Sequence, residues 1–363
     1  MKILFDHQTF TDQIYGGISR YFKYIIDGIK DTEDIDYKLG VLRSNNYYIR
    51  NEHQVLRHKI YNSLFKTPQR LQIRNNSYCK YLIKKGDFSI LHPTYFNPYV
   101  LKNLKRPMVL TVHDMTYEAL PEMFPATDPL PYYKRVMMER ADKIIAISEH
   151  TKNDILKYSN IKAEKIEVVH HGIDLAPNLY TPVEKLPENY ILFVGGRWSY
   201  KNFYMLAEAY KVISKKYPDV KLVLAGGGPL AYGETEYLIR NGLTDKIQQI
   251  SATDEQLNTL YRNAICFVYP SSYEGFGLPI LEAFKNDCPV ILNRSSCFEE
   301  IATAQSALFF EKDNLDSLIA KLDLLINDRK LASQLKEDGK KELARYTIEK
   351  CVAKTLNIYR SLI

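Results

Sequence analysis

Residues 265–283 read ICFVYPSSYEGFGLPILEA. The apolar and aromatic run at 265–269 predicts a buried strand, and the residues from Pro279 onward predict a helix, because proline is favoured in a first helical turn. The loop between them contains Gly275-Phe276-Gly277. Strands that alternate with helices in this way form parallel sheets, and ligands bind at the carboxyl ends of such strands.

The same alternation continues along the whole chain. It indicates parallel sheets with right-handed crossovers. Segment 175–189 is rich in proline, has no apolar periodicity, and predicts a linker. We therefore predict an α/β protein of two Rossmann-like, doubly wound domains that face a cleft, at 1–180 and 186–345, with a terminal helix within 346–363. The predicted strands are 2–6, 37–42, 89–92, 108–113, 143–147, 166–170, 190–194, 221–225, 247–250, 265–269, 289–292 and 307–310.

The composition is that of an ordinary soluble globular protein, with 45% hydrophobic and 25% charged residues among 363. This excludes a disordered or collagen-like chain, and no apolar run reaches the roughly 18 residues that span a bilayer. The first residues, MKILFDHQ, include an acid at position six and predict a strand, not a signal peptide. Five cysteines without a Cys-x-x-Cys motif predict reduced thiols. These features together predict a cytoplasmic location.

Positive charge is concentrated between Arg43 and Lys85. Ten Lys or Arg residues and one acid, Glu52, give this segment a charge of +9, whereas the chain as a whole carries +6. Tyrosines and phenylalanines are interleaved with the basic residues. Such a segment can contact an anionic membrane surface, a phosphorylated substrate or nucleic acid. A solvated surface without a partner explains the charge equally well.

Two carboxylates and a basic pair are candidate ligand-binding residues. Glu274 precedes the helix predicted near Pro279 and Glu282 lies about one turn into it, so the pair can hold two hydroxyl-bearing parts of one ligand. Backbone N–H groups of the intervening glycine loop favour an anion. Arg197 and Lys201 follow the strand at 190–194 and suit a diphosphate, although basic residues before a helix are common on any surface.

Further candidates follow other predicted strands. Gly16 and Gly17 let the backbone approach a phosphate at a helix start, but they form no dinucleotide fingerprint. The Gly-Gly-Gly-Pro segment at 226–229 suits a tight turn or a ligand contact equally. His113 ends the strand at 108–113 beside Asp114, which favours a place in the cleft, although a lone histidine is more often structural. We predict no metal site.

Taken together, these motifs resemble glycosyltransferase family 4, whose members are retaining enzymes with the GT-B fold. The most specific element is Glu274-x₇-Glu282 with Gly-Phe-Gly-Leu-Pro inside it. Segments 4–8 and 16–22 resemble bacterial mannosyltransferases that build O-antigens and other surface glycans. The other segments that carry the resemblance are 15–19, 111–114, 147–149, 170–174, 195–201 and 224–229.

The resemblance implies a nucleotide-sugar site in the second domain. Arg197 and Lys201 would neutralise the diphosphate as it leaves. Glu274, with the N–H groups of Gly275, Phe276, Gly277 and Leu278, would hold the transferred sugar and the phosphate. Glu282 would bind the ribose.

The resemblance also implies roles for the first domain. Gly16 and Gly17 would contact the donor diphosphate, His113 would lie against the sugar near the reacting carbon, and the terminal helix would return to pack on this domain. The expected donor is GDP-mannose, used without a cofactor or metal. The expected acceptor is a glycan or a lipid-diphosphate-linked chain at the inner membrane. Segment 43–85 would make a peripheral contact with that membrane. We predict no nucleic-acid partner.

Three alternatives remain from the sequence alone. The donor can be a UDP-sugar used by a transferase of the same family. The same fold also supports nucleotide-sugar epimerases. It supports phosphorylases as well, but a phosphorylase would need a pyridoxal-binding lysine, and no candidate is evident in the sequence. A receptor that binds a sugar or nucleotide without catalysis has a similar alternation of strands and helices.

Overall fold

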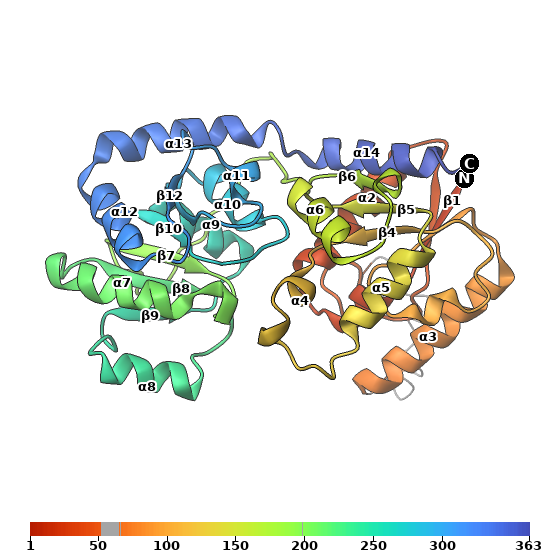
Figure 1. Ribbon diagram of the computed structural model, residues 1–363, viewed down its shortest axis with the longest axis horizontal. Helices are drawn as coiled ribbons and strands as arrows, with labels where there is room; N and C mark the ends of the chain where they lie inside the picture. The colour runs from red at the N-terminus through yellow and green to blue at the C-terminus, as the bar shows by residue number, and fades with distance from the viewer. Residues whose placement is uncertain (52–64, 66, 198) are drawn as a thin grey trace. The chain divides into compact units, whose positions relative to one another are not determined.

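A computed structural model describes residues 1–51, 65, 67–197 and 199–363 (Figure 1). The chain divides into two compact units. Unit 1 consists of Met1–Gly172 and Ile348–Ile363, and unit 2 consists of Ile173–Thr347. Each unit is a parallel α/β sheet covered by helices.

The strands of unit 1 form two three-stranded parallel sheets, ordered β2-β1-β3 and β4-β5-β6. A single parallel bridge between Leu91 and Met108 connects the sheets at β3 and β4. Every residue of β4 is buried, as expected for a strand covered on both faces. The strands are β1 (Lys2–Phe5), β2 (Asp36–Leu39), β3 (Ile90–His92), β4 (Val109–Val112), β5 (Lys143–Ala146) and β6 (Ile166–Val168).

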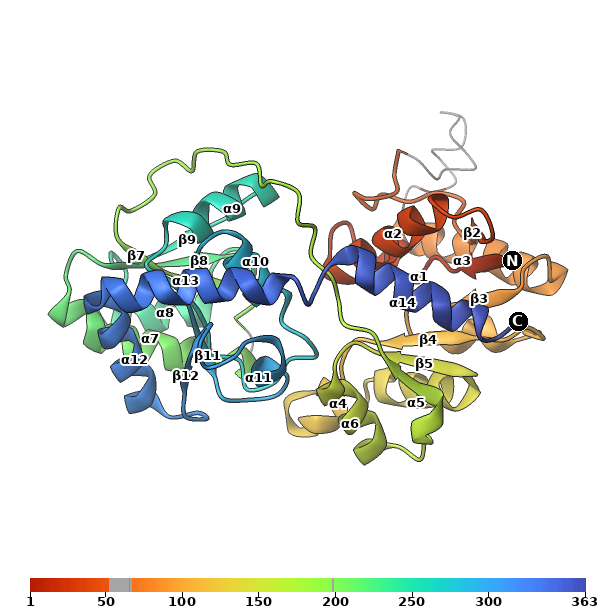
Figure 2. The ribbon, with the colours of Figure 1, turned by 90° about the horizontal axis from the view of Figure 1, so that it is seen from above.

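Two apolar clusters cover the faces of the unit 1 sheet. One contains the inner face of α2 and of the terminal helix α14, which pack against each other (Figures 1 and 2). The other contains Cys79, Leu82 and Ile83 of α3 and Met137 and Met138 of α5. The helices are α1 (Gln8–Asp12), α2 (Gly17–Lys30), α3 (Pro68–Lys85), α4 (Thr116–Ala119), α5 (Leu130–Arg140), α6 (Glu149–Tyr158) and α14 (Ile348–Arg360), with short 3₁₀ turns at Pro98–Leu101, Pro121–Met123 and Ala163–Lys165.

Unit 2 contains one six-stranded parallel sheet, ordered β12-β11-β10-β7-β8-β9. Successive strands extend outward in one direction from β7 and in the opposite direction from β10, which is the Rossmann order. The order therefore reverses between β7 and β10. The strands are β7 (Tyr190–Val194), β8 (Lys221–Ala225), β9 (Ile247–Ile250), β10 (Cys266–Tyr269), β11 (Val290–Asn293) and β12 (Leu308–Phe310).

Helices pack in pairs on the unit 2 sheet. Helix α7 contacts α12, and α10 contacts α9 and α13 (Figure 2). The helices are α7 (Phe203–Lys216), α8 (Tyr232–Arg240), α9 (Asp254–Asn263), α10 (Leu278–Lys285), α11 (Phe298–Ile301), α12 (Leu315–Asn327) and α13 (Arg329–Leu343), with a 3₁₀ turn at Ser199–Lys201. The twelve predicted strands are all present: β7, β8 and β9 have the predicted bounds, and the other nine are shortened or shifted at their ends.

Segment 175–189 contains no helix or strand and belongs to unit 2. Its backbone is held by side chains of that unit. The carbonyl of Leu179 accepts from Asn258, and the carbonyl of Thr181 accepts from the Thr259 hydroxyl at 2.7 Å. The ring of Tyr180 lies 4.6 Å from the guanidinium of Arg262.

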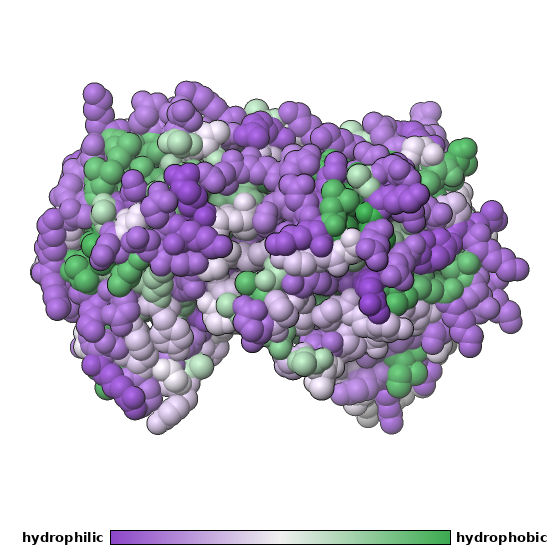
Figure 3. Space-filling model, in the orientation of Figure 1, coloured by the Kyte–Doolittle hydropathy of each residue, from purple (hydrophilic) through white to green (hydrophobic). Residues whose placement is uncertain are grey.

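None of the described helices combines the length and the apolarity needed to cross a bilayer. On the face drawn in Figure 3, hydrophobic side chains form separate groups among hydrophilic ones. The five cysteines are free and buried.

Candidate active site

The loops at the carboxyl ends of β7 and β10 lie where the strand order of unit 2 reverses. Ligands of open α/β sheets bind outside the carboxyl ends of the strands at such a point. Residues 195–202 follow β7 and residues 270–277 follow β10. The two loops contact each other, because the N–H of Ser272 donates to the carbonyl of Tyr200 at 2.8 Å.

Lys201 and Glu274 come from these two loops and form an ion pair. The Nζ of Lys201 lies 2.5 Å from Oε1 of Glu274, with side chains that are 20% and 13% exposed. The ammonium also lies 5.9 Å from the ring centre of Tyr269, the last residue of β10. Burial and the neighbouring Glu274 raise the pKa of the Tyr269 hydroxyl well above its usual value, so at neutral pH the tyrosine adds no charge. The structure thus brings two predicted site residues together.

Residues of the loop after β11 hold the loop that contains Glu274. The N–H of Glu274 donates to the Ser296 hydroxyl at 3.1 Å, and the thiol of Cys297 donates to the carbonyl of Phe276 at 2.7 Å. Burial raises the pKa of Cys297 well above its usual value, so the thiol keeps its proton for this bond. Gly277 has φ of +106°, a left-handed conformation that favours glycine.

Helix α10 begins directly after this glycine. Gly277 is its N-cap and Pro279 lies in its first turn, as predicted. Phe276 is buried and Leu278, the first residue of the helix, is half-buried. Glu282 lies one turn into the helix and accepts from the Tyr261 hydroxyl at 3.3 Å. Both predicted carboxylates therefore belong to one strand–loop–helix unit, with Gly275 between them.

Arg197 has a different environment from Lys201. Its side chain is 3% exposed and its Nε donates to Oε1 of Glu234 at 2.9 Å. The remaining guanidinium nitrogens donate to backbone carbonyls of the loop at 226–229. The structure therefore places this guanidinium against the loop after β8.

In unit 1, Gly16 and Gly17 lie at the start of α2. Gly16 is the N-cap, and a Cβ there would lie 2.5 Å from Oε1 of Gln13. That Oε1 also accepts from the N–H of Ser19 at 3.2 Å, so Gln13 caps the helix. A Cβ at Gly17 would meet nothing within 4 Å, which leaves room for a ligand beside the first helical residue.

His113 follows β4 and is 8% exposed. Its ring stacks on His171 at a centroid distance of 5.7 Å and meets Tyr21 edge-on at 5.4 Å. Burial, followed by Lys134, lowers the pKa of His113 to about 4, although Asp114 opposes this shift. Its Nε2 is buried and has no hydrogen-bond partner among the described residues. The ring is thus neutral near pH 7 and can exchange a hydrogen bond with a ligand hydroxyl.

A series of hydrogen bonds connects Tyr21, whose ring contacts His113, to the terminal helix α14. Tyr21 and Thr111 share a hydrogen bond of 3.1 Å between their hydroxyls, and Thr111 also contacts Nε2 of His92 at 2.9 Å. Nδ1 of His92 lies 2.6 Å from the Tyr359 hydroxyl of α14. Burial lowers the pKa of His92 to about 3, so this chain is uncharged.

The predicted site residues fall into three groups. Lys201, Glu274 and the loop that continues to Leu278 lie together in unit 2. Arg197 forms the second group, because its side chain contacts the loop after β8. The third group, Gly16, Gly17 and His113, belongs to unit 1. Three further residues, Glu234, Ser296 and Cys297, position the loops of unit 2 and are not among the residues predicted from the sequence. Their side chains meet these loops through tertiary contacts, for which the local sequence contains no signal.

Both halves of the chain match known families. Residues 15–177 match the family described as Glycosyltransferase Family 4, and residues 181–342 match the family described as Glycosyl transferases group 1. Together the two matches cover most of the chain.

Several curated relatives are glycosyltransferases. The chain is 28% identical over 234 residues to the O-antigen chain mannosyltransferase RfbU of Salmonella typhimurium, an alignment that covers 64% of each protein. It is 27% identical over 296 residues to the O-antigen chain mannosyltransferase B of Escherichia coli, with coverage of 76% of this chain and 75% of the relative.

Solved structures show the same fold. Anabaena HepE, crystallised with UDP and glucose, has a TM-score of 0.76 at 18% identity, and the match covers 100% of both chains. A sucrose-phosphate synthase from Thermosynechococcus elongatus has a TM-score of 0.74 at 18% identity over 99% of this chain and 98% of that one. The fold is therefore GT-B, as predicted. The two family matches cover most of the chain, and the strand–loop–helix unit contains both Glu274 and Glu282. The chain therefore belongs to glycosyltransferase family 4.

Proposed function

We propose that this glycosyltransferase moves mannose from GDP-mannose to a glycan or lipid-linked acceptor during the synthesis of a bacterial surface polysaccharide. The observation that carries the proposal is the Lys201–Glu274 pair at the strand-order reversal of unit 2. A cation and a carboxylate in one place suit a nucleotide sugar, which has an anionic diphosphate joined to a ring of hydroxyl groups. The mannosyltransferase names of the two O-antigen relatives support the choice of sugar.

Each residue of the pair has a distinct task in this proposal. Lys201 binds the diphosphate and stabilises the charge that grows on its terminal phosphate as the bond to the sugar breaks. Glu274 then accepts hydrogen bonds from the sugar hydroxyls, and Glu282 does so from the ribose. The ion pair must open when the donor binds. Lys201 then becomes available to the diphosphate at the same time as Glu274 becomes available to the sugar.

Transfer proceeds with retention in this proposal. The acceptor oxygen forms a bond to the anomeric carbon on the face from which the phosphate oxygen departs, and the acceptor proton passes to that phosphate oxygen. His113 contributes a neutral hydrogen-bonding Nε2 near the sugar and does not act as nucleophile. The fixed ammonium of Lys201 supplies positive charge, so no divalent metal is required.

The acceptor side is assigned to unit 1. Helix α3 contains no acid, and exposed Arg70, Arg74, Lys80, Lys84 and Lys85 lie along it. Two apolar side chains share its surface: Ile73 and Tyr81 are 63% and 59% exposed. Cations beside exposed apolar groups suit the headgroup region of an anionic membrane. Of the basic segment 43–85, residues 52–64 and 66 lie outside the described residues.

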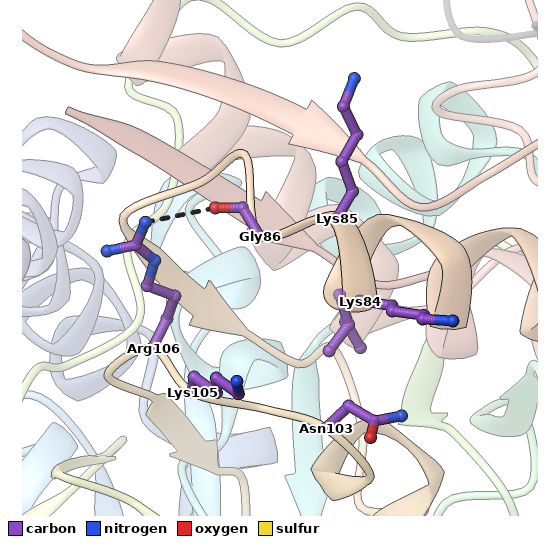
Figure 4. A pocket seen from close by; sticks show the side chains of 7 residues that line it. Lys84, Lys85, Gly86, Asn103, Lys105 and Arg106 are labelled. Atoms are coloured by element: carbon purple, nitrogen blue, oxygen red, sulfur yellow. Dashed lines mark hydrogen bonds between the residues drawn. The ribbon is translucent and has the colours of Figure 1, made fainter.

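The basic surface continues past the end of α3. Lys84, Lys85, Lys105 and Arg106 line a hollow of about 610 Å³ around Gly86. Figure 4 shows the two α3 ammonium groups directed apart, while Arg106 reaches the carbonyl of Gly86 at 3.4 Å. Diverging cations fit an extended anionic surface better than one bound phosphate.

A donor panel tests the proposed function. The protein is incubated with labelled GDP-mannose, UDP-glucose, UDP-galactose and UDP-N-acetylglucosamine, each with a lipid-diphosphate-linked glycan. We expect mannose on the acceptor, and NMR of the product should show the anomeric configuration of the donor. Transfer from UDP-sugars alone would overturn the choice of donor, and an isomerised nucleotide sugar without transfer would identify an epimerase.

A further inference from the structure

The guanidinium of Arg197 is used almost completely by the protein. An arginine has five N–H donors. Nε donates to Glu234, Nη1 donates to the carbonyl of Gly226 at 3.1 Å, and Nη2 donates to the carbonyls of Gly228 at 3.1 Å and Pro229 at 2.9 Å. These bonds use four of the five donors, so a two-point contact with a diphosphate would require at least one of them to break.

The loop that Arg197 contacts has a left-handed backbone at three successive residues. Gly226, Gly227 and Gly228 have φ values of +80°, +68° and +73°, three successive left-handed residues. Their carbonyl oxygens accept hydrogen bonds from the guanidinium, at 3.1 Å for Gly226 and Gly228 and 3.4 Å for Gly227, although the loop residues are themselves exposed. A Cβ at Gly227 would lie 2.8 Å from both Nη1 of Arg197 and the carbonyl oxygen of Gly195. The loops after β7 and β8 are therefore packed backbone against backbone around this side chain.

Glu234 completes the arrangement. One carboxylate oxygen accepts from Arg197, and the other accepts from the N–H of Ala231 at 2.7 Å, at the start of α8. The Glu234 side chain is 12% exposed. The positive charge of Arg197 is thus balanced at 2.9 Å by a largely buried carboxylate, which reduces what it can offer to a phosphate.

We propose that Arg197 is a positioning residue, not a ligand of the diphosphate. With Glu234 it fixes the loop at 226–229 beside the carboxyl end of β7, and Lys201 is the residue of the 195–202 loop that binds the diphosphate. The inference rests on the proposed function, since it requires that unit 2 binds a nucleoside diphosphate. Loss of the Arg197–Glu234 contact loosens the loop and weakens binding of every nucleotide by a similar factor, whatever its number of phosphates.

Nucleotide affinities separate positioning from phosphate binding. Calorimetry gives Kd for GDP, GMP, UDP and UMP with the full chain and with Arg197→Lys, Glu234→Gln and Lys201→Met. We expect Arg197→Lys and Glu234→Gln to weaken monophosphate and diphosphate binding alike, by about tenfold, so that the ratio of the two Kd values is unchanged. Lys201→Met should lower the preference for the diphosphate by about tenfold or more, the size expected for a hydrogen bond to a charged group.

A double variant adds a second measure. Residues that act through one contact show non-additive effects. Arg197→Lys with Glu234→Gln should therefore bind nucleotide no more weakly than the poorer single variant. If Arg197→Lys fails to fold, Gly227→Ala replaces it: this substitution keeps both charges, disturbs the loop, and should weaken monophosphates and diphosphates equally.

The matched control lies on the same helix. Arg240 and Glu236 form an exposed pair on α8 at 3.2 Å, and Arg240→Gln should leave every Kd unchanged. Two outcomes would overturn this inference and leave the proposed function intact. One is a selective loss of diphosphate binding in Arg197→Lys, and the other is wild-type nucleotide binding in Glu234→Gln. A wild-type protein that binds neither GDP nor UDP contradicts the proposed function as well.

Discussion

The Nζ of Lys201 lies 2.5 Å from Oε1 of Glu274, across the two loops of unit 2 between which the strand order reverses. Each group neutralises the other while the site holds no ligand. A nucleotide-sugar donor offers an anion to Lys201 and hydroxyl groups to Glu274. When it binds, the Lys201–Glu274 ion pair is replaced by several contacts with the donor. Under the proposed function, the pair therefore links binding of the diphosphate to binding of the sugar.

Glu274→Gln tests this link. The neutral amide forms no ion pair with the ammonium, so we expect nucleoside diphosphate to bind as tightly as in the wild type or more tightly. The sugar loses a charged acceptor, and we expect kcat for transfer to fall by about 10- to 100-fold. Nucleotide calorimetry and initial rates measure the two effects.

Lys201→Met is the matched variant in the same pair. It should weaken binding of nucleoside diphosphate and lower kcat as well. A Glu274→Gln enzyme with wild-type kcat, or one that loses diphosphate affinity as Lys201→Met does, would contradict the separate tasks of the two residues.

Metal removal gives a second prediction. The proposed function assigns the positive charge beside the leaving group to Lys201, so we expect the rate of transfer to stay the same in excess chelator. The chelator is added to enzyme purified without divalent ions, and the rate is compared with that in magnesium and in manganese. Activity that disappears with chelator and returns with either metal would show that the ammonium is insufficient.

The site of unit 2 could be predicted because its signals are local. The strand at 266–269, the turn at Gly277 and the helix from Leu278 are encoded within a few neighbouring residues, and carboxyl ends of parallel strands meet at one edge of a sheet. Sequence reasoning thus placed Glu274 and Glu282 on one unit and identified Lys201 as a cation nearby.

The environment of Arg197 could not be predicted in this way. Arg197 and Lys201 are four residues apart in one loop, and residue type gives both the same expected task. Their difference arises from Glu234 and the glycine loop, which are 37 and about 30 positions away in sequence. Which cation a distant carboxylate neutralises is decided by tertiary packing.

Buried histidines predict a loss of stability in acid. Burial lowers the pKa of His92 to about 3 and that of His113 to about 4, and it lowers the pKa of His171 well below its usual value. An unfolded histidine binds a proton near pH 6.5, so between pH 6.5 and about 4 the unfolded chain binds more protons than the folded one. Stability therefore falls as pH decreases through this window, by up to about 2 kcal/mol per histidine at pH 5.

Urea unfolding followed by circular dichroism at pH 7 and pH 5 measures this loss. His113→Gln removes one of the three groups, so the difference in unfolding free energy between the two pH values should shrink. The difference between pH 7.5 and pH 8.5 should be the same in both proteins, because histidine is neutral there. An unchanged acid loss in the variant would show that His113 is protonated in the folded protein.

The terminal helix gives another stability prediction. Tyr359→Phe removes the hydroxyl that lies 2.6 Å from Nδ1 of His92 and leaves a fully buried ring nitrogen without this partner. We expect the free energy of unfolding to fall by about 1–3 kcal/mol. The neighbouring Arg360→Gln is the control, since it breaks only exposed contacts, an ion pair with Asp34 and a hydrogen bond to Asn357, and should have little effect. Equal losses in both variants would contradict a special role for the buried contact.

Reversal of charge on α3 tests the membrane contact. The variant carries Glu at Arg70, Lys80, Lys84 and Lys85, all exposed. Each Lys or Arg near an anionic surface contributes about 1 kcal/mol, screened by salt. We expect at least a tenfold loss of co-sedimentation with vesicles of phosphatidylglycerol and phosphatidylethanolamine, together with a higher KM for lipid-linked acceptor. Hydrolysis of the donor by water should keep its wild-type rate, because these residues lie outside the donor loops.

A control variant with the same change in net charge separates local from global effects. It carries Glu at four exposed positions of unit 2, namely Lys215, Lys312, Arg329 and Lys330. Its co-sedimentation and acceptor KM should stay close to those of the wild type, since the α3 surface is intact. Equal losses in both variants would mean that only net charge matters. Wild-type behaviour of the α3 variant would mean that this helix is a solvated surface.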